Sequence, residues 1–306
     1  MNVSEEDAED GALRCGFVAL VGRPNVGKST ILNALLGQKV SIVSRKPQTT
    51  RHRILGIHNT SRAQIVYVDT PGVHAAEKTA MNRYLNRAAA QALADVDAAV
   101  FVVDAQRWTD EDQLVLDALE RCRAPVILAV NKVDRIKDKA ALLPKIEELS
   151  RLREFAAVVP VSATRGTNLE ALEDELTALL PESHPLFPHE QITDRSERFM
   201  AAELVREQLM TALGDELPYA STVEIEAYEQ EGRLRRIAAV IWVERSGQRK
   251  IVIGQGGSRI KGVGRTAREE MERLFGGRVY LKLWVKVREG WSDDERALRS
   301  LGYEDL

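Results

Sequence analysis

Cysteine is almost absent from this 306-residue chain, which contains only Cys15 and Cys122 and no C-x-x-C motif. Two isolated cysteines exclude a disulfide framework and a cysteine-based zinc site. The five histidines show no metal-ligand spacing, so we expect no metal site made from protein ligands alone. Both thiols are expected to be reduced, as in a cytoplasmic protein.

Long apolar runs are also missing. No stretch reaches the roughly 18 apolar residues that a membrane-spanning helix needs. The first ten residues are acidic and polar, unlike a secretory signal, and we expect residues 1–14 to form a disordered tail. The remaining composition is that of a globular protein, with 44% hydrophobic residues, 29% charged residues and a net charge of −3. The length is sufficient for two domains.

The main motif is Gly22-Arg-Pro-Asn-Val-Gly-Lys-Ser29, which lies between an apolar run at 17–21 and a predicted helix at 30–37. Strand, glycine loop and helix are the context of a phosphate-binding P-loop. Gly22 and Gly27 let backbone N–H groups converge on phosphates, and the helix dipole adds to the attraction. Lys28 is expected to reach the β- and γ-phosphates, and Ser29 to hold Mg²⁺. An incidental glycine turn is the alternative, which the flanking strand and helix disfavour. The predicted nucleotide-binding residues of this loop are Gly22, Arg23, Pro24, Asn25, Val26, Gly27, Lys28, Ser29 and Thr30.

Short apolar strands alternate with helices up to about residue 180, which predicts an α/β domain with a doubly wound, mostly parallel sheet. Such sheets bind ligands at the carboxyl ends of their strands. The remaining candidate motifs follow these strand ends, apart from one that lies in a loop. We therefore expect them to surround one nucleotide. The further strands are predicted at 54–57, 65–68, 98–103, 126–130 and 158–161.

The motif Asp69-Thr-Pro-Gly72 is predicted to serve the metal and the γ-phosphate. Its carboxylate is expected to contact Mg²⁺ through water, and its Gly72 N–H to sense the γ-phosphate, although the motif alone also fits an ordinary turn. In the loop before residue 54, a threonine is expected to close on Mg²⁺ and the γ-phosphate. Thr49 and Thr50 are both candidates, and we favour Thr50; a plain exposed loop is the alternative. The predicted metal residues are Ser29, Thr50 and Asp69.

The motif Asn131-Lys132-Val-Asp134 predicts the selection of guanine. The Asp134 carboxylate can accept hydrogen bonds from guanine N1–H and N2–H₂, whereas adenine offers neither donor there. Ser162-Ala163 is expected to place a backbone N–H near the guanine O6. Each motif alone also fits a charged or plain loop, but five motifs in this order predict GTP as the ligand.

The sequences GRPNVGKS, TT, DTPG, NKVD and SAT resemble the motifs of the translation-factor-related class of P-loop GTPases over residues 15–182. This resemblance implies hydrolysis of GTP to GDP and phosphate, with catalytic roles for Asn25, Lys28, Thr50 and Gly72. Val73 stands where Ras-like enzymes have a water-orienting glutamine, and a valine cannot orient water. Similar GTPases that combine such an apolar residue with an asparagine at the position of Asn25 use K⁺. The resemblance therefore implies K⁺; the alternative for Asn25 is a residue that caps its own turn.

Three prolines within residues 181–188 predict a stiff linker, which we place at 183–194. Residues 195–306 are predicted to form a smaller α+β domain. Within it, Ile253-Gly254-Gln255-Gly256-Gly257 joins two helical segments and resembles the loop of a KH domain, whose glycines allow close approach to four nucleotides of a single strand. The predicted order α–β–β–α–α–β fits the prokaryotic KH variant.

The segment 245–268 is strongly basic, with seven Lys or Arg residues and no acid. In a net-acidic chain, this is a local electrostatic footprint for phosphates. A solvated charged face and a helix–turn–helix corner are the alternatives, but the loop and the basic segment together favour nucleic acid. The predicted RNA-binding residues are Lys250, Gly254, Gln255, Gly256, Gly257, Arg259 and Lys261.

Almost the whole chain resembles a family of P-loop GTPases that carry one C-terminal KH domain. The matching segments are QTTRHRI, ITDRSERFM, VIGQGGSRIK, LWVKV and WSDDERALRSLGY. The resemblance implies a cytoplasmic monomer that binds the 3′ end of 16S ribosomal RNA and assists maturation of the 30S ribosomal subunit. It also implies peripheral association with the inner face of the cell membrane, which no basic amphipathic helix or lipidation motif here supports. The alternative function is a non-catalytic RNA-binding assembly scaffold with a structural nucleotide, which Val73 keeps open.

Overall fold

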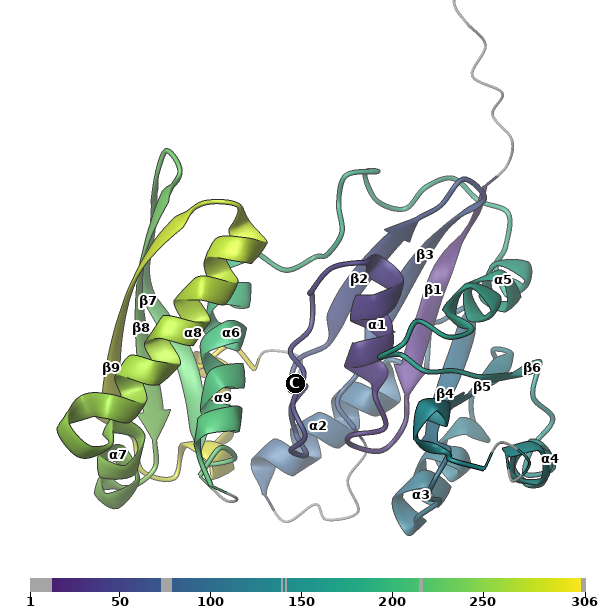
Figure 1. Cartoon of the computed structure of the whole chain (residues 1–306), viewed down its shortest axis with the longest axis horizontal. Coiled ribbons are helices and arrows are strands. Elements are labelled where there is room, and N and C mark those ends of the chain that lie inside the picture. The colour runs from purple at the N-terminus through teal and green to yellow at the C-terminus, as the bar shows by residue number, and fades with distance from the viewer. Residues whose placement is uncertain (1–12, 73–78, 139, 141, 215–216, 304–306) are drawn as a thin grey trace, which may run out of the picture.

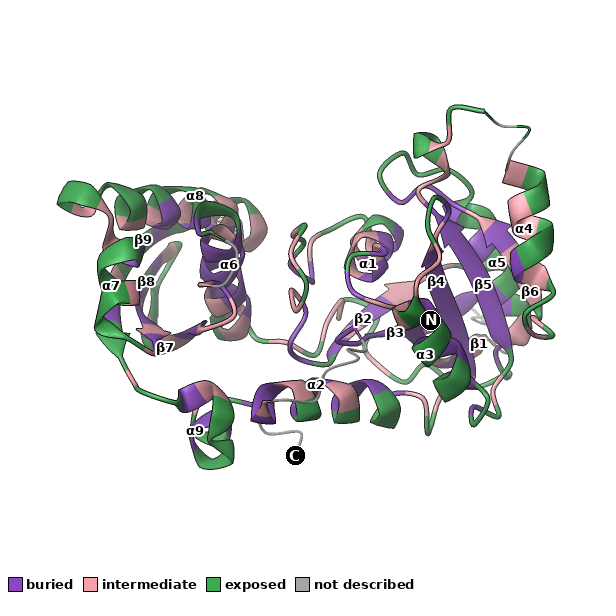
Figure 2. Cartoon of the chain, turned by 90° about the horizontal axis from the view of Figure 1, so that it is seen from below, coloured by how far each residue is buried: buried purple, intermediate pink, exposed green. Residues whose placement is uncertain are grey.

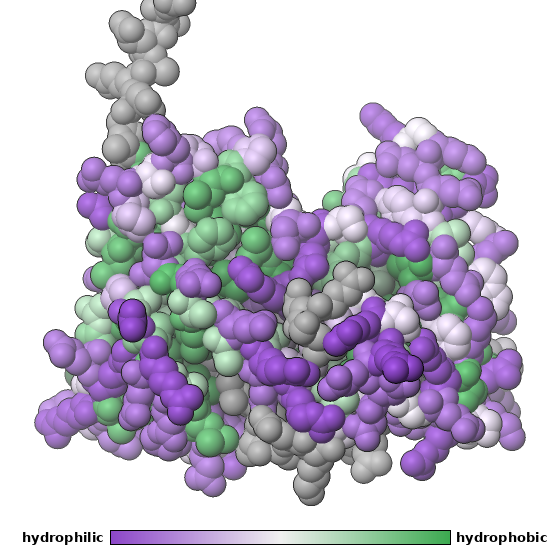
Figure 3. Space-filling view, turned by 180° about the vertical axis from the view of Figure 1, so that it is seen from behind, coloured by the Kyte–Doolittle hydropathy of each residue, from purple (hydrophilic) through white to green (hydrophobic). Residues whose placement is uncertain are grey.

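The computed structural model describes residues 13–72, 79–138, 140, 142–214 and 217–303. The predicted N-terminal tail lies outside these ranges up to residue 12, and so does Val73. Two domains stand side by side, each built on its own sheet (Figure 1). Seen from behind, they form two lobes that meet along their lower parts and leave an open notch above (Figure 3).

The first domain contains a six-stranded sheet in the order β2-β3-β1-β4-β5-β6, parallel except for β2. Its strands are β1 (Arg14–Val21), β2 (Ile54–Asn59), β3 (Ala63–Asp69), β4 (Ala98–Asp104), β5 (Val126–Asn131) and β6 (Ala157–Pro160). The predicted doubly wound sheet is thus confirmed. One prediction is wrong at its edge: Arg14, which we assigned to the tail, already belongs to β1, because residues 14–16 pair with 63–65 of β3.

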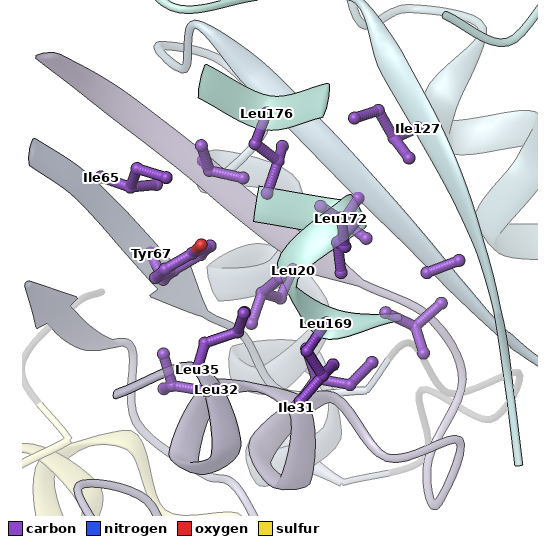
Figure 4. Close-up of a cluster of buried hydrophobic side chains, with 14 of the residues drawn as sticks. Leu20, Ile31, Leu32, Leu35, Ile65, Tyr67, Ile127, Leu169, Leu172 and Leu176 are labelled. Carbon is purple, nitrogen blue, oxygen red and sulfur yellow. The ribbon is translucent and has the colours of Figure 1, made fainter. Parts of the chain in front are cut away.

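Helices cover both faces of this sheet. One face carries α1 (Lys28–Leu36) and α5 (Leu169–Leu179), and the other carries α3 (Asp110–Leu119) and α4 (Leu142–Ser150). Along β1, Leu20 points toward α1 and α5, whereas Val21 points to the opposite core. Figure 4 shows how leucines of α1 and α5 interdigitate over the sheet. Each fully buried leucine contributes about 1.5–3 kcal/mol, so these layers hold the strand ends, and the loops that follow them, in place.

The second domain has the predicted order α–β–β–α–α–β. Its elements are α6 (Glu197–Ala212), β7 (Ser221–Glu231), β8 (Leu234–Val243), α7 (Ser246–Ile253), α8 (Ser258–Phe275) and β9 (Arg278–Val287). The sheet order is β7-β8-β9, with β8 and β9 parallel. Helices α6 and α8 cover one face, and Figure 2 shows the buried residues between these helices and the strands. The short helix α7 and the long helix α8 flank the predicted G-x-x-G loop.

The C-terminal segment returns to the first domain. After β9, helix α9 (Glu295–Ser300) packs against α2 (Ala80–Gln91), and the two form a small apolar cluster of their own. Trp291, Leu298 and Tyr303 are buried there against Tyr84. The Asp293 carboxylate also accepts a 2.8 Å hydrogen bond from the first backbone N–H of α2. The C-terminal segment therefore joins the second domain to the first.

The proline-rich linker is bound along the first sheet. The Ile57 N–H of β2 donates to the Ile192 carbonyl at 2.8 Å, and the Leu55 N–H donates to the Asp194 carboxylate at 3.0 Å. The Gln64 side chain meanwhile accepts from and donates to the backbone of Phe187. The linker thus adds a partner to the outer edge of β2, where we predicted only a stiff spacer.

Candidate nucleotide and RNA sites

The loop between β1 and α1 needs its glycines for close packing. Gly22 has φ +153° and Gly27 has φ +108°, and a Cβ atom at either would collide with Val102 or Asn131. Asn25 also has a positive φ of 64°. A Cβ at Gly72 would lie only 2.8 Å from the Pro24 nitrogen. The backbone after β3 therefore touches the loop after β1, as a γ-phosphate sensor beside a phosphate cradle requires.

Lys28 places a buried cation in this loop. Its Nζ donates to the carbonyl oxygens of Gly22 at 2.8 Å and Arg23 at 3.1 Å. Burial lowers the pKa of the Lys28 ammonium to about 8, and the nearby Asp69 carboxylate opposes this shift. An ammonium held against two carbonyls at the start of a helix is well placed to receive phosphate oxygens.

The predicted metal residues converge on one carboxylate oxygen. Asp69 Oδ2 accepts 2.8 Å hydrogen bonds from Ser29 and from Ser41, and the Thr50 hydroxyl lies 2.9 Å from Ser29 Oγ. Burial raises the pKa of Asp69, while Lys28 and the hydroxyl bonds oppose the rise. Asp69 Oδ1 is buried without a hydrogen-bond partner among the described residues. A spare carboxylate oxygen beside two hydroxyls is a hard oxygen donor set that fits Mg²⁺.

The two candidate threonines face different ways. Thr50 directs its hydroxyl at Ser29, whereas the Thr49 hydroxyl lies 2.7 Å from Ser44 Oγ and donates to the Lys46 carbonyl at 2.7 Å. Only Thr50 therefore belongs to the oxygen cluster. Ser41, which shares Asp69 with it, was missed because an isolated serine in a loop carries no sequence signal.

The guanine motif ties the base loops to the P-loop. Asn131 donates to the Val26 carbonyl at 2.8 Å and accepts from the Ala163 N–H at 3.2 Å. Lys132 Nζ lies 2.6 Å from the Asn25 carbonyl and 2.8 Å from Asp104. Asp134 is exposed, and its Oδ1 accepts a 2.6 Å bond from Ser162. The predicted residues therefore come together, with one carboxylate oriented by a serine.

Arg23 is the exception within the P-loop. Its guanidinium turns toward α3, where Nε forms a 2.8 Å ion pair with the buried Asp112 and a second nitrogen donates to the Arg107 carbonyl. The Arg23 side chain is therefore held mainly by α3 and the segment before it, and its one bond within the loop is to the Pro24 carbonyl at 3.4 Å. The sequence could not reveal this, because Asp112 lies 89 positions further along the chain.

These loops line one cavity of about 1060 Å³. The volume is within the usual order of size for a small-molecule site. Its walls include Lys28, Thr50 and Asp134 from the first domain, and also Met210 and Thr211 from α6 of the second. The second domain thus contributes to the outer wall of the nucleotide site.

The loop between α1 and β2 (residues 38–53, the α1–β2 loop) is held by the second domain. Lys39 Nζ lies 2.5 Å from Glu207 of α6 and 2.6 Å from Glu270 of α8. Glu207 also accepts a 2.9 Å bond from the Val43 N–H. Arg206, itself fully buried with Glu203, donates to the Thr49 carbonyl. Both sides of Thr50 are therefore fixed by α6 and its surroundings.

Arg51 and His52 continue this contact. The fully buried Arg51 guanidinium donates to the carbonyls of Ser221 at 2.9 Å and Pro218 at 3.1 Å. His52 stacks on Tyr303 with ring centres 4.6 Å apart and meets Phe199 edge-on. Burial lowers the pKa of His52 to about 4. The residues next to Thr50 are thus part of the interface between the domains.

The G-x-x-G loop has the backbone that close approach requires. Gly254, Gly256 and Gly257 have φ values of 73°, 58° and 77°. Gln255 and Gly256 are exposed, and nothing lies within 4 Å of a Cβ built on Gly256. Lys250 and Lys261 are also exposed, whereas Arg259 is exposed but donates to the Ile251 carbonyl. The loop therefore presents bare backbone flanked by cations.

Two family models match the chain in the order of its domains. The model of the 50S ribosome-binding GTPase matches residues 17–132, and the KH domain model matches residues 216–292. Among curated proteins, GTPase Era from Pseudomonas aeruginosa (strain LESB58) is 61% identical over 293 residues, which are 96% of each chain. GTPase Era from Stenotrophomonas maltophilia is 59% identical, covering 95% of this chain and 97% of the relative.

Solved structures match as closely in shape. A crystal structure of Era in complex with MgGDPNP and nucleotides 1506–1542 of 16S ribosomal RNA superposes with a TM-score of 0.92 at 39% identity, covering 95% of this chain and 99% of the other. Aquifex aeolicus Era Y63A bound to GDP·AlF4⁻ gives a TM-score of 0.90 at 39% identity and the same coverage.

Proposed function

The chain belongs to the GTPase Era family and is a GTPase, and on this premise we propose that it is a nucleotide-controlled switch that binds the 3′ end of 16S ribosomal RNA and assists maturation of the 30S subunit. We assign residues 15–182 to the GTPase domain, 183–194 to the linker and 195–306 to the KH domain. The observation that carries the proposal is the run Thr49–Arg51, which contacts the second domain on both sides while Thr50 faces the candidate metal cluster.

On the nucleotide side, the residues divide by chemistry. The loop 22–30 cradles phosphates through its N–H groups, and Lys28 adds charge at the β- and γ-phosphates. Ser29 and Thr50 would supply hydroxyl ligands for Mg²⁺, and Asp69 would hold it through water. Mg²⁺, when bound, neutralises the charge that develops on the phosphate oxygens. The base is selected by Asp134, which Ser162 orients, and by the N–H of Ala163.

For hydrolysis, we propose that the Gly72 N–H senses the γ-phosphate and that Asn25 helps to hold K⁺ near the β–γ bridge. Asn25 supports this role with its positive φ and with its backbone carbonyl, which is held by Lys132 at the mouth of the loop. Val73, outside the described residues, supplies no group that orients water. The built-in rate is therefore expected to be low.

The K⁺ role predicts a salt dependence of turnover. Steady-state GTP hydrolysis should be faster in K⁺ than in Na⁺ at equal ionic strength, because the positive charge of an arginine finger is worth roughly 10³–10⁵ in the rate of other GTPases and K⁺ would supply such a charge here. Asn25→Ala should abolish the difference. Equal rates in both salts would contradict the K⁺ role, while a K⁺ response that survives in Asn25→Ala would contradict only the role of Asn25.

On the RNA side, we propose that Gly254–Gly257 clamp a single strand, with Lys250, Arg259 and Lys261 at its phosphates. GTP turnover measured with and without 16S 3′-end RNA separates this switch from an RNA scaffold with a structural nucleotide. Turnover that is absent in both conditions would contradict the switch.

The cellular site stays a prediction. We expect a cytoplasmic monomer, and among the described residues no helix is long and apolar enough to cross a membrane. Peripheral association with the inner face of the membrane is testable by flotation with vesicles of anionic lipid.

A further inference from the structure

Helices α6 and α8 cover one face of the sheet in the second domain. These helices lie between the sheet and the first domain, so the other face of the sheet points away from the first domain (Figures 1 and 2). Side chains along β9 alternate between the two faces. Val279 and Val285 are buried in the core under α8, whereas Tyr280 and Trp284 are 48% and 43% exposed. Two large aromatic side chains therefore stand on the outward face of one strand, about 13 Å apart along it.

Cations lie beside the Tyr280 ring and at the alternate positions of the same strand. Arg278, Lys282 and Lys286 occupy the same alternate positions of β9, which contains no acid. Lys282 Nζ lies 5.6 Å from the centre of the Tyr280 ring, and the Arg236 guanidinium of β8 lies 5.9 Å from it. Lys286 and Arg236 are paired with Glu226 and Glu231, whereas Arg278 and Lys282 form no ion pair within the described residues. We call Arg236, Arg278, Tyr280, Lys282 and Trp284 the β9 outer surface.

We propose that the β9 outer surface is a second site for single-stranded RNA, at which unpaired bases stack on Tyr280 and Trp284 while phosphates contact Arg278 and Lys282. Exposed aromatic rings on a sheet beside cations are the means by which proteins hold unpaired nucleotides. An apolar partner would bury the cations without compensation. A polyanion whose bases have flat apolar faces satisfies both the rings and the charges.

The surface lies across one edge strand from α8, which begins at the proposed G-x-x-G site, and the inference rests on that proposed RNA function. Gly264 of α8 approaches β9 so closely that a Cβ there would lie 3.2 Å from Leu283. Leu283 precedes Trp284 and points to the opposite face. Because β9 is an edge strand, RNA leaving the α8 side needs to cross only that edge to reach Trp284.

The test compares two RNA lengths on the full-length protein. The short probe has about four nucleotides, the span of a KH loop, and the long probe has about twelve nucleotides of the 16S 3′ end, within the range of extended single-strand sites. Tyr280→Thr/Trp284→Thr keeps strand propensity and removes both rings. It should leave short-probe affinity unchanged and lower long-probe affinity by roughly tenfold or more, since one stacked base is worth about 1–3 kcal/mol.

Two variants that each remove one positive charge supply an independent readout and leave both aromatic rings in place. Lys282→Gln should reduce the salt slope of long-probe binding by about one ion, whereas Arg233→Gln, at the exposed turn before β8, should leave it unchanged. The Gln255→Asp/Gly256→Asp variant should lower the affinity of both probes. If the Gln255→Asp/Gly256→Asp variant binds both probes as the unchanged chain does, the G-x-x-G proposal is wrong. Failure of the G-x-x-G site and failure of the second site are therefore seen in different variants.

Several results would overturn the second site. These are unchanged long-probe affinity in the threonine variant and an equal salt slope for Lys282→Gln and Arg233→Gln. Retention of an acidic protein on this surface, without an RNA effect, would also overturn it. Urea midpoints and GTP affinity equal to those of the unchanged chain establish that the variants are folded.

Discussion

At the scale of single residues, we expect Asp134 to select the base of the nucleotide. Its Oδ1 is held by Ser162, and we propose that the carboxylate thus oriented accepts from guanine N1–H and N2–H₂. Asp134→Asn places an amide N–H group opposite the N–H groups of guanine and should weaken GTP binding by about 1.5–3 kcal/mol. XTP has a carbonyl in place of the amino group, so it should bind the variant more tightly than it binds the unchanged chain. Calorimetric titrations with GTP and XTP measure both effects.

The matched control for this substitution is Asp138→Asn. It makes the same charge change on an exposed carboxylate four positions later. This control should keep GTP preference. If Asp134→Asn also binds GTP as the unchanged chain does, Asp134 is not at the guanine site.

His52 predicts a pH dependence of stability. Its pKa falls from 6.5 to about 4 on folding, chiefly because the ring is buried. Between these values the unfolded chain takes up a proton that the folded chain does not. The contribution of neutral His52 to the free energy of unfolding is therefore fully present above pH 6.5 and is lost as pH falls toward 4. The loss is roughly 2 kcal/mol between pH 7 and pH 5.

His52→Phe keeps the aromatic contacts with Tyr303 and Phe199 but cannot be protonated. Urea unfolding at several pH values should therefore show a flatter profile between pH 4 and pH 6.5 for this variant. His184→Phe, which changes an exposed histidine of the linker, should leave the profile unchanged. Parallel profiles for His52→Phe and the unchanged chain would contradict the assigned shift.

At the scale of elements, the G-x-x-G loop between α7 and α8 carries the prediction for RNA. Gln255→Asp/Gly256→Asp places two carboxylates on exposed backbone that is proposed to touch phosphates, so RNA affinity should fall and its salt slope should decrease. Gly256 has φ +58°, a conformation that strains most side chains but that Asp adopts more readily, and a Cβ there meets nothing within 4 Å, so the fold should persist. Filter binding over a salt series with 16S 3′-end oligonucleotides measures this.

Gly232→Asp is the control for added charge. This glycine lies in the turn between β7 and β8, has φ 61° and has nothing near its Cβ position, so the substitution should leave RNA binding almost unchanged. GTP affinity should be unaltered in all three proteins. RNA affinity equal to that of the unchanged chain in the double variant would remove Gly254–Gly257 as the clamp.

The elements themselves were predictable where the sequence is periodic or carries a motif. The buried strands β4 and β5 are continuous apolar runs, and the P-loop fixes the junction of β1 and α1. The start of β1 at Arg14 was not predictable, because pairing with β3 overrides the polar sequence. In the linker, the prolines predicted only a stiff segment. Its hydrogen bonds to β2 were not predictable, because they join residues more than 130 positions apart.

At the scale of the whole molecule, the contact between domains escaped sequence reasoning. Arg51 looks like any exposed arginine until the fold brings the carbonyls of Pro218 and Ser221 to it. The same applies to Tyr303, whose ring meets both His52 and Tyr84. Such contacts join single residues from three distant segments, so neither spacing nor composition indicates them. They give the α1–β2 loop its second set of partners.

These contacts have a mechanical consequence. Thr50 faces the candidate metal cluster, while the residues on either side of it are bonded to α6 and to the start of β7. A change that draws Thr50 toward Mg²⁺ and a γ-phosphate must therefore either stretch these bonds or move the second domain. The account expects the second domain to move, and with it the surface that meets RNA.

The affinity of the full-length protein for a 16S 3′-end oligonucleotide, measured in Mg²⁺ with GDP and with a non-hydrolysable GTP analogue, tests this coupling most directly. The account predicts tighter binding with the GTP analogue, by a coupling of about 1–3 kcal/mol, and by reciprocity tighter binding of the analogue when RNA is present. Equal RNA affinity in the two nucleotide states would contradict it.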